Sequence, residues 1–293
     1  MIFVLIIVQS ALGLSEIARI VNEKKTTWTA RDYSKDIIDD SIIQKQQLDS
    51  FQQFFDMKAV PAPLNNNLPE SFDAREKWQN LYGIKKQGKC SSCWAHAAAE
   101  VAENRLAING CPKGRLSPQD LISCDLNDNG CTFGLPYVVW PHVLQYGIAT
   151  EECIPYVSNE SRIPLCPTKC ANGSDIVRYK PERISYLLAK DMQQEILDNG
   201  HVDTAIITYE DFSHYEKGIY QHTYGGPVYA HAIVAIGWGV ENGIPYWLIQ
   251  NSYGEEWGEK GYFKILRGSN ECGVETLPFV GVERFKSVRN SGS

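Results

Sequence analysis

The chain has 293 residues, of which 43% are hydrophobic and 22% are charged, so it can bury a sizeable core and lacks the composition of a disordered protein. Its 28 basic and 35 acidic residues give a formal net charge of -7. No basic cluster offsets this acidic balance, which argues against a nucleic-acid partner.

The first residues predict a secretory signal peptide over residues 1–13. Residues 2–8 are apolar without interruption, and the small residues Ser10, Ala11 and Gly13 suit a signal peptidase site. A strand or a membrane anchor is the weaker interpretation, because the apolar run is too short to span a bilayer. No later run is long enough either, so we expect a protein of the secretory pathway with no membrane span.

Residues 14–67 are expected to form a pro-segment. They are mostly polar and charged, and the proline- and asparagine-rich stretch from Pro61 to Asn67 interrupts any regular structure. A segment of this kind behind a signal peptide is typical of a precursor with a cleavable linker, and a small N-terminal subdomain is the alternative. The main body then runs over residues 68–293.

Cys93 lies where a loop leads into a predicted helix. An alanine-rich stretch without helix breakers follows it as far as Ile108, so the helix begins almost at the thiol. The unpaired N–H groups and the positive dipole end of such a helix stabilise a thiolate. We therefore expect the pKa of Cys93 to lie below that of a free thiol.

Cys90, three residues before Cys93, leaves two other kinds of site open. Two cysteines separated by two residues also serve as a redox pair or as half of a zinc site. A redox pair should follow a buried strand, whereas a polar Gln-Gly-Lys loop precedes this one, and Cys124 with Cys131 is too widely spaced for a second zinc pair. We expect no metal and no cofactor, and a secreted disulfide oxidoreductase stays an alternative.

The second half of the chain is expected to be rich in strands. After a helix around residues 190–199, short β-prone runs occupy residues 204–209, 232–236, 246–249 and 261–265. The turn Glu241-Asn242-Gly243 joins the second and third of these runs. A helical half thus meets a sheet half, and a cleft between them is the natural place for a site.

His231 and Asn251 are the best candidates for the partners of a reactive thiol. Such a thiol needs a base, and the base needs a third group that fixes its tautomer. His231 opens one predicted strand and Asn251 closes the next, so neighbouring strands would bring them to one sheet end. His96, one helical turn after the thiol, is assigned to packing or tuning. The other histidines are expected to be surface or satisfied core groups: His142, His201, His214 and His222.

Together these motifs resemble the papain family of cysteine proteases, in particular its cathepsin B branch. The resemblance covers the main body and is carried by residues 68–75, 87–94, 116–121 and most of 231–275. It implies an α+β papain-like fold of two subdomains, with a helical left half, a β-barrel-like right half and the active-site cleft between them.

The resemblance also implies a cysteine endopeptidase that works through a Cys93 thiolate and an acyl-enzyme. His231 would be the base paired with the thiolate, and Asn251 would orient the His231 ring. Gln87 would donate its side-chain amide, together with the Cys93 N–H, to the oxyanion of the tetrahedral intermediate.

Five residues are carried over to the substrate cleft: Gly134, Phe133, Ala230, Trp257 and Leu277. Gly134 would pair its backbone with extended substrate, and Phe133, where the family usually has glycine, would narrow the cleft. Leu277 stands where cathepsin B has an acidic residue, at the base of the pocket for P2, the second residue before the scissile bond. We therefore expect apolar P2 residues to be preferred, because a buried guanidinium would find no partner.

Cathepsin B carries an insertion with a His-His pair that blocks the prime side of its cleft. The stretch between Cys153 and Cys170 is short in this chain and holds no histidine. We therefore expect an open prime side without an occluding loop, and endopeptidase rather than dipeptide-removing activity.

The chain has nine cysteines, and in an oxidising compartment an odd number leaves at least one thiol unpaired. The resemblance implies three bridges, which join Cys90 to Cys131, Cys124 to Cys166, and Cys153 to Cys170. Cys111 and Cys272 can be free or joined. Two sequons for glycosylation lie in the same loop-rich region, Asn159-Glu160-Ser161 and Asn172-Gly173-Ser174.

Two more positions depart from the family: Ser91 replaces a glycine, and Tyr253 replaces the tryptophan that covers the catalytic asparagine. The smaller Tyr253 is expected to leave the bond between Asn251 and His231 less shielded from water. These departures, with Phe133, keep open a catalytically weak or inactive homologue that binds peptides or inhibitors.

The resemblance further implies the partners of the protein. These are protein and peptide substrates, the chain's own pro-segment as an inhibitor, and cystatin-like inhibitors. We expect a monomer that acts in a lysosome-like vacuole or outside the cell.

Overall fold

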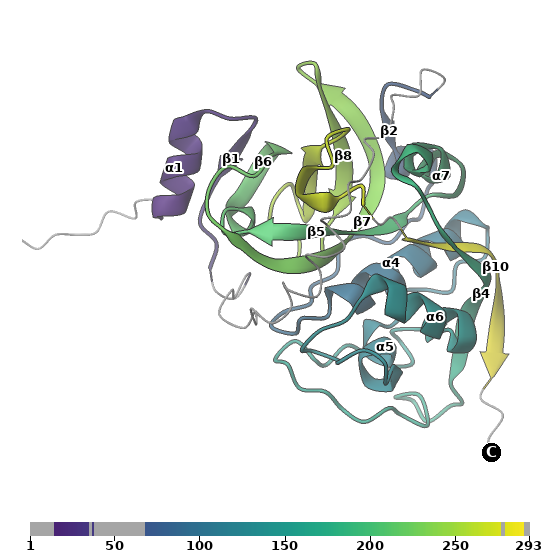
Figure 1. Cartoon of the computed structure of the whole chain (residues 1–293). Helices are drawn as coiled ribbons and strands as arrows, with labels where there is room; N and C mark the ends of the chain where they lie inside the picture. Colours follow the sequence, from purple (N-terminus) through teal and green to yellow (C-terminus); the bar gives the residue numbers. More distant parts are fainter. Residues whose placement is uncertain (1–14, 35–36, 38–67, 277–278, 290–293) are drawn as a thin grey trace, which may run out of the picture.

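The structure is a computed structural model that describes residues 15–34, 37, 68–276 and 279–289. Figure 1 shows that the helices α4, α5 and α6 gather in one half of the molecule and most strands in the other. The predicted α+β fold with a helical half and a sheet half is confirmed. The signal peptide expected over residues 1–13, the linker at 61–67 and Leu277 lie outside the described residues.

The helices of the described residues are short apart from α4. Their bounds are α1 Glu16–Lys24, α3 Ala74–Lys77, α4 Cys93–Ile108, α5 Pro118–Cys124, α6 Pro136–Tyr146 and α7 Met192–Asn199, with 3-10 helices at Ala189–Asp191, Phe212–His214 and Glu271–Gly273. The helix predicted to begin at the thiol is confirmed, since α4 starts at Cys93 itself. The helix predicted around residues 190–199 is α7, preceded by a 3-10 turn.

The described strands form one ten-stranded sheet with the path β1-β6-β9-β8-β7-β5-β10-β4-β3, and β2 pairs with β7. Their bounds are β1 Trp28–Ala30, β2 Phe72–Asp73, β3 Ile148–Ala149, β4 Val177–Tyr186, β5 Val202–Tyr209, β6 Tyr215–Tyr220, β7 Pro227–Glu241, β8 Ile244–Gln250, β9 Tyr262–Leu266 and β10 Phe279–Arg289. The predicted turn between β7 and β8 is confirmed, with positive φ angles of 53° at Asn242 and 80° at Gly243.

The long strand β7 joins the two halves of the molecule. Its side chains alternate between two hydrophobic cores, because successive residues of a strand point to opposite faces. Ala232 and Val234 pack into the core around α4, whereas Ile233 and Ala235 pack into the core of the sheet half. The N-terminal part of β7, where His231 lies, is therefore held from both sides.

All three disulfides expected from the resemblance are present. Cys90 bridges Cys131, Cys124 bridges Cys166, and Cys153 bridges Cys170. The thiols of Cys93, Cys111 and Cys272 are free, so the last two are not joined to each other.

The N-terminal segment packs on the sheet half. In Figure 1, α1 lies beside β1, and β1 pairs antiparallel with β6 so that Trp28 faces Gly218. Gly218 has a φ of 96°, and a Cβ there would come within 2.4 Å of the Thr27 carbonyl oxygen, so this close approach requires glycine. Trp28 and Ala30 are buried in the core of the sheet half.

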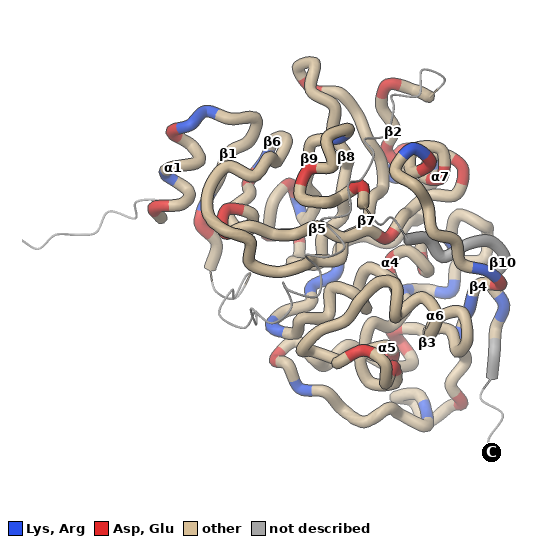
Figure 2. Tube along the Cα trace, viewed as in Figure 1, with Lys and Arg blue, Asp and Glu red and all other residues tan. Residues whose placement is uncertain are grey.

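Figure 2 shows acidic and basic residues interspersed along the described trace. In the part of the chain that the structure describes, no helix is both long and apolar enough to cross a membrane. The same residues contain no group of three or more His, Cys, Asp or Glu side chains that could hold a metal ion.

Candidate active site

Cys93 is the first residue of α4, and the loop before it is tied down. The Cys90–Cys131 bridge holds the loop, and the Ser91 N–H donates to the Cys131 carbonyl over 3.0 Å. Ser92, which caps the helix, is fully buried. These contacts fix the thiol at the positive end of the helix.

The strand β7 carries His231 to the same place. The backbone N–H of Ala232, together with that of Trp94, lies close enough to the Cys93 sulfur to favour its anion and lower its pKa. Ala232 directly follows His231 in β7. The structure thus brings the N-terminus of α4 and the start of the predicted strand together, as the sequence suggested.

His231 is held by Asn251, which follows the neighbouring strand β8. The His231 Nε2 and the Asn251 Oδ1 are 2.7 Å apart, and the same Oδ1 accepts the Ser252 N–H over 2.8 Å. Because an amide oxygen only accepts hydrogen bonds, Nε2 is the donor. Nδ1 of the neutral ring is therefore the basic nitrogen.

Tyr253 covers the bond between His231 and Asn251. Its ring stacks on the imidazole with 4.8 Å between centroids and 28° between planes. His231 and Asn251 are each only 1% exposed, and Tyr253 is 6% exposed. The Tyr253 hydroxyl bonds to the hydroxyl of Tyr229, so the bond is well covered by this ring; that a tryptophan would shield it better stays a prediction.

Gln87 is held rigidly beside the thiol-bearing loop. Its Nε2 donates to the Cys90 carbonyl over 2.9 Å, and its Oε1 accepts the Ser252 hydroxyl over 2.6 Å. The Tyr156 hydroxyl also donates to the Gln87 carbonyl over 2.5 Å. An amide carries two hydrogens, and Cys90 takes one, so the second remains for an oxyanion.

Burial shifts the pKa values of Cys93 and His231 in the directions that favour their uncharged forms. It raises the pKa of Cys93 to about 11, and the opposing N–H groups of Ala232 and Trp94 only reduce this effect. It also lowers the pKa of His231 to about 4, against the favourable bond to Asn251. The expected depression of the thiol pKa was therefore wrong, because desolvation outweighs the helix end. Both shifts run in the direction that favours the uncharged form, although Cys93 keeps some exposed surface.

His96 has the packing role assigned to it. It is 1% exposed, its Nδ1 lies 3.0 Å from the Ser92 carbonyl oxygen, and its ring meets Tyr156 edge-on. Burial lowers the pKa of His96 to about 3. The ring is therefore a neutral part of the helical half.

Two of the expected substrate-binding residues belong to a small apolar cluster. Phe133 and Ala230 pack against buried Leu135 and Ile207, and Ala230 pairs with Ile207 across β7 and β5. Gly134 lies directly on the indole of Trp94, where a Cβ would come within 2.4 Å of the ring. Glycine is required at this position for steric reasons.

Trp257 is buried beside the lid residue Tyr253. It has no exposed surface, and its Nε1 donates to the Ser213 carbonyl over 3.1 Å. Its ring packs on Tyr253, Phe212 and Phe263. Trp257 therefore supports the lid over His231, and it is buried while the N-terminal segment is in place; its role as a substrate-binding residue stays a prediction.

The loop between Cys153 and Cys166 packs against the segment that follows Gln87. The Lys89 N–H donates to the Asn159 carbonyl over 2.7 Å, and the Ser161 hydroxyl donates to the Lys89 carbonyl over 2.7 Å. Lys89 and Glu160 also form an ion pair of 2.7 Å. The loop is thus fixed beside the candidate oxyanion site.

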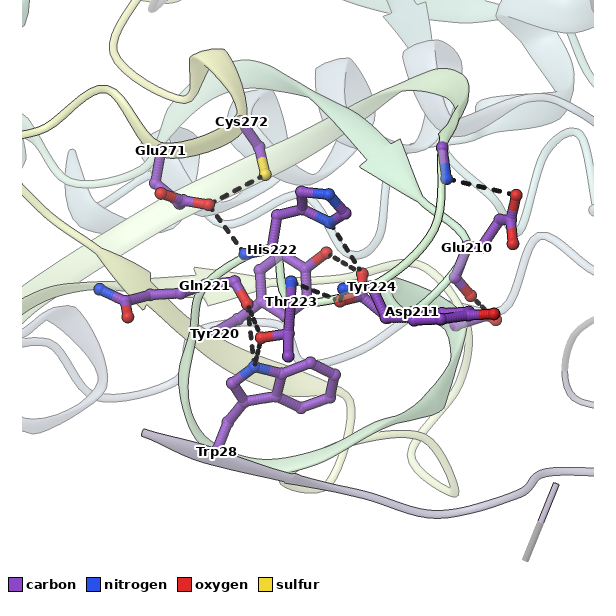
Figure 3. Close-up of polar contacts among 12 residues, drawn as sticks. Trp28, Glu210, Asp211, Tyr220, Gln221, His222, Thr223, Tyr224, Glu271 and Cys272 are labelled. Carbon is purple, nitrogen blue, oxygen red and sulfur yellow. Dashed lines mark hydrogen bonds and ion pairs between the residues drawn. The ribbon is translucent and has the colours of Figure 1, made fainter. Parts of the chain in front are cut away.

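The N-terminal segment is anchored to the loop after β6 through Trp28. Figure 3 shows its indole Nε1, which donates to the Gln221 carbonyl over 2.9 Å and lies 3.2 Å from the Thr223 hydroxyl. Buried Asp211 holds this loop by accepting the Thr223 N–H over 2.7 Å, and Glu271 accepts the His222 N–H over 2.9 Å.

A second anchor lies at Tyr33, which joins the segment to the loop before β9. Its hydroxyl donates to the Tyr215 carbonyl and accepts the Gly258 N–H, both over 2.7 Å. The N-terminal segment therefore contacts Gly258, the residue that follows Trp257 in the chain.

No role was predicted from the sequence for Ser252, Tyr229, Leu135 or Ile207. A role for Tyr229 could have been predicted, because it lies two residues before His231 and so shares its face of the strand. The other three act through contacts between distant segments, and no local pattern reports them.

A family model described as papain family cysteine protease matches residues 68–282. The chain is 35% identical over 308 residues to "Cathepsin B-like cysteine proteinase 4" of Caenorhabditis elegans, which covers 92% of both chains. It is 40% identical over 215 residues to "Cathepsin B-like CP3" of Giardia intestinalis, with 71% of this chain and 72% of that protein covered.

Among solved structures, the fold is similar to procathepsin B S9 from Trypanosoma congolense. The TM-score is 0.78 at 31% identity, with 92% of this chain and 99% of that chain covered. Both the sequence match over the main body and the fold match thus point to the same proteases. The chain belongs to the papain family of cysteine proteases and is cathepsin B-like.

Proposed function

We propose that the protein is a cysteine endopeptidase in which Cys93 is the nucleophile and His231 its base. The observation that carries the proposal is the buried 2.7 Å bond from His231 Nε2 to Asn251, which leaves Nδ1 basic next to the strand residue whose N–H reaches the sulfur. Asn251 fixes the tautomer, and Gln87 supplies an amide hydrogen to the oxyanion.

The reaction begins with the transfer of the Cys93 proton to its base. The proton passes from the Cys93 sulfur to His231 Nδ1 as the sulfur–carbon bond forms, and the carbonyl electrons move to the oxygen held by Gln87 and the Cys93 N–H. The N–H groups of Ala232 and Trp94 stabilise the thiolate during this transfer. His231 then protonates the leaving amine, and water, deprotonated by His231, releases the acyl group.

Apolar residues are preferred at P2. The proposal is supported by the cluster around Leu135 and Ile207, which includes Ala230, the residue before His231. This cluster offers apolar surface, and a guanidinium would lose its hydration there. Leu277, expected at the base of this pocket, adds no charge.

The prime side is open, and the enzyme cuts within chains. Support comes from the stretch between Cys153 and Cys170, which is short, lacks histidine and is held against Lys89 through Asn159. Although the enzyme is cathepsin B-like by family, it thus lacks an occluding loop of the cathepsin B type.

Residues 1–13 are a signal peptide, 14–67 an inhibitory pro-segment and 68–293 the peptidase domain. This division is supported by the family match, which begins at residue 68, and by the anchoring of Trp28 and Tyr33 on the sheet half. It further agrees with the fold match to a procathepsin. The protein acts as a monomer in a lysosome-like vacuole or after secretion, and cystatin-like inhibitors bind it.

Labelling of the thiol tests this function. An epoxide that alkylates reactive cysteines should label the processed protein once and abolish cleavage of fluorogenic peptides. Cys93→Ala should remove both label and activity, whereas Cys111→Ala, which changes an exposed free thiol, should keep both. A properly folded processed protein that is neither labelled nor active would instead be an inactive homologue that binds peptides.

A further inference from the structure

We propose that Tyr229 is a positioning residue for the catalytic imidazole. Its hydroxyl, bonded to the hydroxyl of Tyr253, locks the Tyr253 ring over His231 and keeps water from the His231–Asn251 bond. The inference rests on the function proposed above and concerns a residue that contributes no atom to the reaction.

Tyr229 reaches His231 because the two are separated by one residue in β7. Residues two apart in a strand point to the same face. The Tyr229 ring meets the imidazole edge-on, with 6.0 Å between centroids and 81° between planes. The Thr208 hydroxyl donates to the Tyr229 carbonyl over 2.9 Å, which fixes its backbone against β5.

Tyr253 is the second member of the pair, and it covers the other side of the ring. It stacks on the imidazole at 4.8 Å and meets Trp257 edge-on at 5.3 Å. A tyrosine lid is smaller than an indole and carries a polar hydroxyl that must be satisfied when it is 94% buried. The hydroxyl of Tyr229 bonds to it and so anchors the hydroxyl end of the ring.

A nearby cavity explains why the lid needs an anchor. A cavity of about 160 Å³ is lined by Tyr229 and Tyr209 on the sheet half and is bordered by Ile17 of the pro-segment, so it faces solvent once that segment is removed. Tyr229 therefore borders both this cavity and the imidazole. If the hydroxyl pair were broken, water from the cavity could compete for Nε2 of His231, and the ring would lose its fixed tautomer.

A double-mutant cycle tests the proposal. Tyr229→Phe should lower kcat about tenfold, which corresponds to about 1.4 kcal/mol, with KM unchanged. Tyr253→Phe and the double phenylalanine variant should show the same loss, because all three lack the same bond. Tyr146→Phe, which changes an exposed tyrosine in the helical half, should behave like the parent.

The tryptophan background supplies the decisive comparison. An indole at position 253 fills the site without the phenolic hydroxyl, so adding Tyr229→Phe to Tyr253→Trp should change kcat less than about twofold. An equal loss in both backgrounds would mean that Tyr229 acts only through packing and would overturn the proposal. So would an unchanged kcat for Tyr229→Phe.

A measurement that does not depend on peptide cleavage separates this inference from the proposed function. In protein with isotope-labelled histidine, exchange of the His231 Nε2–H with water, followed by NMR, should be slow in the parent and at least about tenfold faster in Tyr229→Phe. Equal exchange rates would overturn the proposal. A parent that protects this proton but cleaves no peptide would sink the proposed function and leave the tyrosine pair intact.

Discussion

The hydroxyl of Ser252 donates to the side-chain oxygen of Gln87 over 2.6 Å, and both residues are buried. This bond links the candidate oxyanion donor to the residue after Asn251. It fixes which end of the Gln87 amide is oxygen and which is nitrogen. One buried contact therefore couples the two sides of the candidate catalytic site.

Removal of that contact should impair catalysis more than binding. In Ser252→Ala, Gln87 loses the donor that orients its amide, so we expect kcat to fall about tenfold with little change in KM. Ser269→Ala, at an exposed position of the sheet half, should match the parent. Steady-state kinetics on a fluorogenic peptide would measure both, and a loss confined to KM would contradict the oxyanion role of Gln87.

Gly134→Ala should lower stability as well as activity. The new methyl group would come within 2.4 Å of the Trp94 indole, and over-packing of this kind costs about 1–3 kcal/mol. The thermal midpoint and kcat/KM should both fall. Gly83→Ala is the matched control, because nothing lies within 4 Å of its Cβ position. A variant as stable as the parent would show that Trp94 can move away.

The protein should be more stable in acid than at neutral pH, in part through Glu100. Burial raises the pKa of Glu100 to about 8, so the folded state holds a proton that the unfolded state releases above about pH 4.5. Stability from this group is complete below that pH and falls by about 1.4 kcal/mol per pH unit until the pH reaches the folded pKa.

Glu100→Gln isolates this effect. The amide cannot ionise, so the unfolding free energy of the variant should fall less steeply between pH 5 and 8 in urea titrations. Exposed Glu182→Gln is the control and should keep the pH dependence of the parent. Parallel curves for Glu100→Gln and the parent would rule out Glu100 as the source. A protein whose stability rises toward acidic pH is suited to an acidic vacuole.

Substrate profiling tests the apolar cluster. Peptides with leucine or phenylalanine at P2 should be cleaved at least about tenfold faster, by kcat/KM, than peptides with arginine, because a buried guanidinium finds no partner there. Leu135→Ala should weaken the preference for the bulky residues. Arginine as the best P2 residue would refute the assignment of the pocket.

The proposal of an open prime side predicts the mode of cleavage. An internally quenched peptide should be cut within the chain, and release of a C-terminal dipeptide should be at least about tenfold slower, since no histidine pair is available to bind a terminal carboxylate. Mass spectrometry of the products distinguishes the two. Dominant dipeptide release would mean that other residues of the loop from Cys153 to Cys166 close the prime side.

Local sequence patterns predicted the elements that carry the site. The helix at Cys93, the strand at His231 and the turn at Asn242-Gly243 all follow from spacing and turn chemistry within short windows. The three disulfides followed only from resemblance to the papain family, since cysteine spacing alone leaves many pairings possible.

Only the tertiary structure decided the electrostatics of the site and its lid. The helix end that favours a thiolate is local and visible in the sequence, whereas the desolvation that raises the pKa of Cys93 arises only in the folded chain. Likewise, Tyr253 alone looked too small to cover His231, and its partner Tyr229 came from another strand. The sequence thus determined which groups could react, because those signals lie within a few residues. Folding determined their charge and shielding, because desolvation and packing sum over atoms that are distant along the chain.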